Sequence, residues 1–130
     1  MIVRTLAAFL RNRRGAAAAE FALVLSAMLF FTLGAFNITL VLSAVSGLNR
    51  AAEAAARYAS VQTSLTGADP GSSAVTTWAS GQYKGPNIGA TFTYSPDTGC
   101  GHTVNATGTY QLITGFAQVP LALGANACFP

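Results

Sequence analysis

Few residues in this sequence are of a type that could support acid–base, nucleophilic or metal chemistry. Its 130 residues include four acidic side chains, two cysteines and one histidine. A single histidine gives no basis for proposing a Ser-His-Asp triad, and a structural zinc site needs four protein ligands. A site built from Cys100, His102 and Cys128 would lack a fourth ligand. We therefore expect no catalytic residue, no metal and no cofactor, and a protein that is not an enzyme.

One acidic residue stands where its position suggests a specific role. Glu20 lies at the edge of an uncharged run, Phe21 to Asn49, directly after the sequence RRGAAAA. An unpaired carboxylate in lipid costs several kcal/mol, so an acid at this position is a functional candidate. The alternative is that Glu20 lies at the level of the lipid headgroups and is solvated there. The residue types alone leave both interpretations open.

The element that positions Glu20 is a long apolar helix. At about 1.5 Å per residue the run from Phe21 to Asn49 spans about 43 Å, which exceeds the roughly 30 Å of a hydrocarbon core. We expect the membrane part at about residues 21–45, the most apolar stretch. A buried helix of a soluble protein is disfavoured, because the rest of the chain could not cover it. A cleaved secretory signal with a weak site at Leu42-Ser43-Ala44 is a further alternative, although its apolar region is usually shorter.

The charge distribution predicts the orientation of this helix. The formal net charge is +3, but four arginines lie in the first 14 residues, where there is no acid. From Gly15 onward there are three basic residues against four acidic ones. Basicity confined to the N-terminus argues against nucleic-acid binding. By the positive-inside rule it keeps the N-terminus cytoplasmic and sends residues from about 50 onward across the membrane.

The local sequence around Glu20 resembles the processing site of type IV prepilins. The resemblance rests on Arg13 to Phe21, in which Gly follows basic residues, Glu comes five positions later and an apolar helix begins. It implies that a prepilin peptidase cuts between Gly15 and Ala16 and removes a cytoplasmic leader, residues 1–15. Glu20 and Phe21 would then open the mature helix and set its register against neighbouring subunits. The basic residues of the leader are Arg11, Arg13 and Arg14.

A second block, Leu48 to Ala59, extends the resemblance to TadE-like proteins, the minor pilins or pseudopilins of the tight-adherence (Flp, type IVc) pilus. Asn37 stands where this family often has an acidic residue. The resemblance implies a structural subunit that takes part in pilus assembly or initiation. It also implies a single-pass protein of the bacterial inner membrane with a periplasmic head, which can enter the extracellular pilus after assembly. The implied partners are the peptidase and other pilins, with no nucleic acid and no small-molecule substrate.

The helix is expected to continue beyond the membrane, over residues 16–62 in all. Alanine, the strongest helix former, dominates its last part. One face carries apolar residues at helical spacing, namely Leu48, Ala51, Ala52, Ala55, Tyr58 and Ala59. Arg50, Glu53 and Arg57 share another face, which is either solvated or a contact with a partner in the pilus machinery.

Residues 63–130 are expected to form a small α+β head, giving a pilin-like fold. Gly67 to Gly71 should end the long helix, and Ser72 or Ser73 should cap a short helix that carries Val75 and Trp78. Two or three antiparallel strands should follow, among them Thr91–Tyr94 and Val104–Ile113. The expected core residues of this part are Tyr110, Leu112 and Phe116.

Two questions about the head stay open at this level. Cys100 and Cys128 both fall on the translocated side, where a disulfide would persist and stabilise a small core by about 3–4 kcal/mol; two free thiols are the alternative. The chain could also be a signal-anchored periplasmic binding or accessory module with no filament role. Loss of piliation on Glu20→Ala would separate the pilin from such a module.

Overall fold

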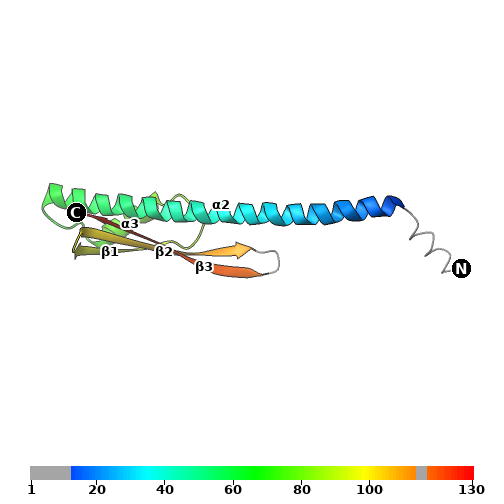
Figure 1. Cartoon of the computed structure of the whole chain (residues 1–130). Coiled ribbons are helices and arrows are strands. Elements are labelled where there is room, and N and C mark those ends of the chain that lie inside the picture. The colour runs from blue at the N-terminus through cyan, green and yellow to red at the C-terminus, as the bar shows by residue number, and fades with distance from the viewer. Residues whose placement is uncertain (1–12, 114–116) are drawn as a thin grey trace. The chain divides into compact units, whose positions relative to one another are not determined.

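The structure is a computed structural model that describes residues 13–113 and 117–130 (Figure 1). The fold is α+β, as the sequence predicts. The chain forms two compact units, Met1–Phe36 and Asn37–Pro130, which are described separately. Arg11 and Phe116, two of the residues singled out above, lie outside the described residues. The elements are helices α2 (Arg13–Thr66) and α3 (Ser72–Gln82) and strands β1 (Thr91–Thr98), β2 (Gly101–Ile113) and β3 (Gln118–Phe129).

The described part of the first unit is the N-terminal part of α2. This helix includes Arg13 and ends at Thr66, so it is longer at both ends than the expected residues 16–62. Every residue from Gly15 to Phe36 is exposed, although the helix contains a window of mean hydropathy 2.1. At about 1.5 Å per residue these residues span about 33 Å, close to the thickness of a hydrocarbon core. The helix is therefore long and apolar enough to cross a membrane.

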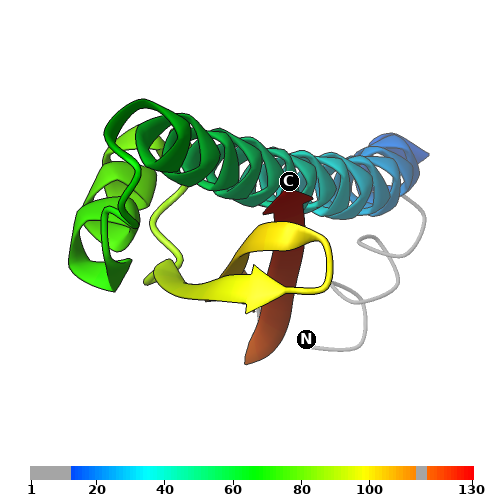
Figure 2. The same cartoon turned by 90° about the vertical axis from the view of Figure 1, so that its left-hand side faces the viewer.

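In the second unit the C-terminal part of α2 packs against the sheet. Its buried face is formed by small residues, so the sheet can approach the helix axis closely. Figure 2 shows the sheet along one side of α2, with α3 beside it. The fully buried residues on this face are Ala44, Leu48, Ala51, Ala52, Ala55 and Ala59, which confirms the predicted apolar face apart from Tyr58, which is half-buried.

The sheet is antiparallel with the strand order β1-β2-β3. Strand β1 pairs with β2 from Thr91↔Thr107 onward, whereas β2 and β3 pair along their whole length, from His102↔Phe129 to Ile113↔Gln118. The last part of β2 therefore pairs with β3 alone, and the β2–β3 hairpin projects beyond β1 (Figure 1). Strand β3 lies at an edge of the sheet, which is where a proline such as Pro120 is tolerated.

The connection from α2 to α3 corrects one detail of the sequence prediction. Helix α2 ends before Gly67, whose φ of 70° is easily reached only by glycine. Helix α3 begins at Ser72, and its N-cap is Gly71, with no side-chain cap hydrogen bond. The expected serine cap is therefore wrong, because Ser72 and Ser73 already belong to the first turn. Asp69 makes the nearby polar contact instead, since its Oδ1 accepts a hydrogen bond from the Gly71 N–H at 2.7 Å.

The core of the second unit joins both helices to the sheet. Leu48, Val75 and Val104 are its largest fully buried side chains. Tyr110 is buried and Leu112 is half-buried against the same cluster, as expected from the sequence. Trp78 of α3 stacks on Tyr58 of α2 with ring centroids 5.0 Å apart.

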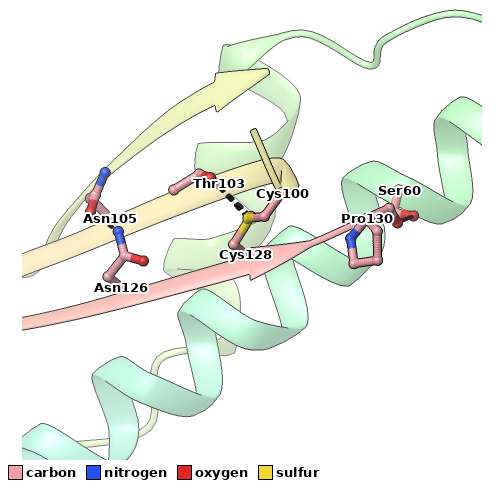
Figure 3. Close-up of a disulfide and its surroundings, with 7 residues drawn as sticks. All are labelled: Ser60, Cys100, Thr103, Asn105, Asn126, Cys128 and Pro130. Carbon is pink, nitrogen blue, oxygen red and sulfur yellow. Dashed lines mark hydrogen bonds between the residues drawn. A yellow bond between two sulfur atoms is a disulfide. The ribbon is translucent and has the colours of Figure 1, made fainter. Parts of the chain in front are cut away.

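A disulfide fixes the end of the sheet that lies near the C-terminus (Figure 3). It joins Cys100, in the turn before β2, to Cys128 in β3, with Cα atoms 6.4 Å apart. The Thr103 hydroxyl donates to Cys128 Sγ at 3.1 Å. The Ser60 hydroxyl of α2 donates to the carbonyl of Pro130 at 2.5 Å, so the end of the chain is held against the long helix.

Candidate functional site

The predicted cleavage site lies in the first turns of α2. Gly15 and Ala16 are both exposed, and a Cβ atom built at Gly15 would meet nothing within 4 Å. The described part of the chain therefore gives no steric reason for a glycine here. Glycine lowers helix stability by roughly 0.8–1 kcal/mol relative to alanine, so Gly15 weakens the helix at the bond that the sequence marks for cleavage.

Glu20 lies four residues beyond Ala16, on the same face of α2. Its side chain is exposed, and the neighbouring Phe21 is 66 % exposed. Glu20 is the only charged residue between Gly15 and Phe36. Residues 15–36 of the first unit thus carry one carboxylate near the start of an apolar helix, and all their side chains are exposed.

Two polar side chains within this apolar helix bond to their own backbone. Ser26 donates to the Leu23 carbonyl at 2.8 Å, and Thr32 donates to the Met28 carbonyl at 3.0 Å. Because each hydroxyl proton is already donated to a backbone carbonyl, neither side chain has an unpaired hydrogen-bond donor that would be costly in lipid. Both residues are therefore compatible with an apolar environment without a partner helix.

Asn37, the first residue of the second unit, bonds to the end of the hairpin. Its Nδ2 donates to the carbonyl of Ile113 at 3.2 Å, and its Oδ1 accepts from the Ile113 N–H at 3.4 Å. The Tyr110 hydroxyl also donates to Oδ1, at 3.4 Å. In the sequence, an amide side chain within an apolar run is the one sign of this contact. The sequence does not indicate that its partner is the backbone of Ile113, 76 residues further along the chain.

The predicted charges on the helix face lie together in the structure. Arg50, Glu53 and Arg57 are all exposed, and they line a hollow of about 720 Å³ on the second unit. The stacked rings of Tyr58 and Trp78 line the same hollow, as does Phe129 at the end of β3. This surface therefore combines three charges with aromatic side chains.

A second hollow, which shares Arg50 with the first, is lined by two basic side chains. Arg50 and Lys84 line it with the hydroxyls of Ser43 and Ser46. Tyr83 packs beside it against Gly47, where an added Cβ would lie 3.0 Å from the tyrosine ring. The Tyr83 hydroxyl donates to the Pro86 carbonyl at 2.8 Å, and burial raises its pKa above the usual 10.0.

Sequence reasoning missed a polar chain that links the α2–α3 loop to the sheet. The buried Tyr94 hydroxyl donates to Asp69 Oδ2 at 2.9 Å and lies 2.6 Å from His102 Nδ1. The tyrosine has a single hydroxyl proton, which it donates to Asp69. In the contact with His102 the tyrosine oxygen is therefore the acceptor, and His102 Nδ1–H is the donor. The rings of Tyr94 and His102 also stack, with centroids 6.0 Å apart. These contacts join the α2–α3 loop to strands β1 and β2. In the described part of the chain no group of three acidic, cysteine or histidine side chains could hold a metal.

Comparison with known proteins bears on the N-terminal half. A family model described as "TadE-like protein" matches residues 15–57, about a third of the chain. The match begins at Gly15, contains Glu20 and ends at Arg57, so it covers the apolar helix and the helix-face charges but not the sheet. It confirms the resemblance drawn from the sequence and is consistent with a protein of the tight-adherence pilus system. No curated protein and no solved structure matches the chain.

Proposed function

We propose that this chain is a minor pilin or pseudopilin that takes part in the assembly or initiation of a tight-adherence pilus. The observation that carries the proposal is the match to TadE-like proteins over residues 15–57, combined with an apolar helix that is exposed throughout residues 15–36. Such a helix needs lipid or other helices around it. A pilin uses both in turn, first as a membrane protein and then as a filament subunit.

Cleavage by a prepilin peptidase after Gly15 would prepare the helix for assembly. It would remove the basic leader, including Arg11, Arg13 and Arg14, and create an α-ammonium group at Ala16. That group would lie one helical turn from Glu20, or could pair with Glu20 of a neighbouring subunit. A paired carboxylate is far less costly in an apolar bundle than a lone one, so the pair would fix one axial register between subunits.

The proposed location is the bacterial inner membrane, with the N-terminus cytoplasmic and the second unit periplasmic. The arginines before Gly15 support this orientation through the positive-inside rule. The disulfide between Cys100 and Cys128 supports it independently, because disulfides persist in the oxidising periplasm. The proposed role is structural, and the partners are the peptidase and other pilins.

The test is the N-terminus of the protein isolated from its native membrane, with and without the prepilin peptidase. We expect an N-terminus at Ala16 that depends on the peptidase, measured by intact mass or N-terminal sequencing. An N-terminus at Met1 in both strains would overturn the processing step and favour an anchored accessory module. A start near Val45 would instead identify a long secretory signal.

A further inference from the structure

We propose that the charged and aromatic surface of the second unit binds a short segment of another protein that carries both acidic and apolar side chains. This surface consists of the two hollows that share Arg50 and Ala54, and we call it the basic hollow. All of its residues belong to the second unit, so the inference depends neither on the anchor nor on cleavage after Gly15.

The basic hollow collects every basic side chain that follows the leader. From Gly15 onward the sequence has three basic residues, Arg50, Arg57 and Lys84, and all three line this surface. Glu53 is the one acid among the lining residues, so three positive charges against one negative charge give a formal charge of +2. The remaining three acids from Gly15 onward lie elsewhere. Charge complementarity therefore favours a negatively charged occupant.

The spacing of the two arginines favours a carboxylate as the negative group. Arg50 and Arg57 are seven residues apart, so they lie on the same face of α2, about 10 Å apart along its axis. Both are exposed, and a guanidinium group can bond both oxygens of a carboxylate. Ala54 lies between them and is half-buried, so its small side chain leaves room for a partner chain.

The apolar part of the basic hollow favours a hydrophobic side chain next to that carboxylate. Val61 is 43 % exposed and Phe129 is 41 % exposed, and both line it together with the half-buried rings of Tyr58 and Trp78. A partner side chain placed here would remove this apolar surface from water, which is favourable. A small inorganic anion would leave it uncovered, so a peptide segment fits the surface better.

This apolar part is already fixed in the free chain. The rings of Tyr58 and Trp78 stack at 5.0 Å with an interplanar angle of 8°. The disulfide at Cys128 and the bond from Ser60 to Pro130 hold the residues on either side of Phe129. A surface that is formed before binding loses less conformational freedom when a partner arrives.

The length of the basic hollow determines the length of the segment. From Ser46 to Val61 the helix rises about 22 Å, which an extended segment of about seven residues would span.

A second copy of this chain lacks a suitable segment. Asp69 and Asp97 have no large apolar residue within two positions in the sequence. Glu20 is followed by Phe21, but both belong to helix α2 and are not part of an extended segment. The occupant is therefore a segment of a different protein.

The test is a titration of the full-length protein in nonionic detergent with the peptide acetyl-Ser-Phe-Asp-Gly-Asp-Phe-Ser-amide, whose sequence is the same in both directions. Trp78 is the one tryptophan of the chain and lines the basic hollow, so its emission reports on the occupant. We expect a saturable shift of this emission to shorter wavelength. Peptides with Asn in place of both Asp residues, or Ser in place of both Phe residues, should bind about tenfold more weakly.

Variants of the protein locate the binding site. Arg50→Gln and Arg57→Gln should each weaken binding by about tenfold, because each removes a charged donor to the carboxylates. Thr93→Glu is the matched control, since it lowers the net charge by the same amount on the other face of the sheet. Thr93 is exposed and alternates with the buried Tyr94. This variant should bind the peptide like the wild type.

Several outcomes would overturn the inference. These are the absence of a shift, equal binding of the Asn peptide, and equal affinity in the wild type and the arginine variants. An equal loss in Thr93→Glu would show a nonspecific attraction of charges. If the emission of Trp78 changed with protein concentration alone, a second copy would cover the surface. A shift with dioctanoyl phosphatidylglycerol and none with the peptide would identify an anionic lipid as the occupant instead.

Discussion

The side-chain amide of Asn37 hydrogen-bonds both the N–H and the carbonyl of Ile113, a residue 76 positions away in the chain. An amide presents one donor and one acceptor side by side, so it matches the two polar groups of a single backbone residue. Ile113 ends β2 at the free end of the hairpin, where β1 no longer supports the sheet. The contact therefore stabilises a part of β2 that does not pair with β1.

Replacing Asn37 by Leu should loosen the hairpin end without unfolding the second unit. The lost bonds are worth about 1 kcal/mol, which corresponds to about fivefold faster amide hydrogen exchange at Ile113. Asn49→Leu is the matched control, because Asn49 bonds to the Val45 carbonyl of its own helix at 3.0 Å. Equal exchange rates at Ile113 in the wild type and Asn37→Leu would contradict the assigned role of the amide.

The buried hydroxyl of Tyr94 should contribute to the stability of the second unit. Tyr94→Phe removes the bonds to Asp69 and His102 and should lower the free energy of unfolding by about 1–2 kcal/mol. Tyr58→Phe is the control, because it keeps the ring that stacks on Trp78. Thermal unfolding in detergent measures both variants, and an equal loss in the two would show that the Tyr94 network adds nothing specific.

The sequence predicted the helical parts of the fold better than the contacts between distant segments. The repeat of Leu48, Ala52, Ala55 and Ala59 reveals the buried face of α2 because helical periodicity is local. Strand β3 has a weaker signal, since Gln118–Phe129 contains Pro120, Gly124 and three alanines, all poor strand formers. Pairing with β2 and packing on α2 outweigh these local preferences.

The polar contacts were hidden for a related reason. Asn37 meets Ile113, and Tyr94 meets Asp69, only after the sheet has folded onto the helix. Nothing in the residues next to Asn37 indicates a backbone partner, and the family resemblance marks the position only as one where an acid is common. The expected serine cap of α3 is wrong because Gly71, with a φ of 83°, is the N-cap, so Ser72 and Ser73 already lie in the first turn.

Gly15 should matter for processing and not for the fold of the helix. Gly15→Ala should stabilise α2 locally by roughly 0.8–1 kcal/mol, keep the bond helical and slow cleavage. Gly34→Ala is a matched control, since an added Cβ meets nothing within 4 Å at either position. Cleavage is measured from the intact mass of each variant isolated from cells that contain the peptidase. Normal processing of Gly15→Ala would show that the peptidase does not require glycine before the cut.

Glu20 should determine assembly and not the stability or insertion of the single chain. It is exposed, and the second unit folds from Asn37 onward, so Glu20→Ala should leave the membrane-bound level of the protein unchanged. Pilus number, counted by electron microscopy, should fall strongly in Glu20→Ala and in Glu20→Gln, because both remove the charge that would compensate the α-ammonium at Ala16. Glu20→Asp keeps the charge, so we expect this variant to form an intermediate number of pili. Normal piliation in Glu20→Ala would favour an anchored accessory module, since a helix that serves only as a tether does not need the carboxylate.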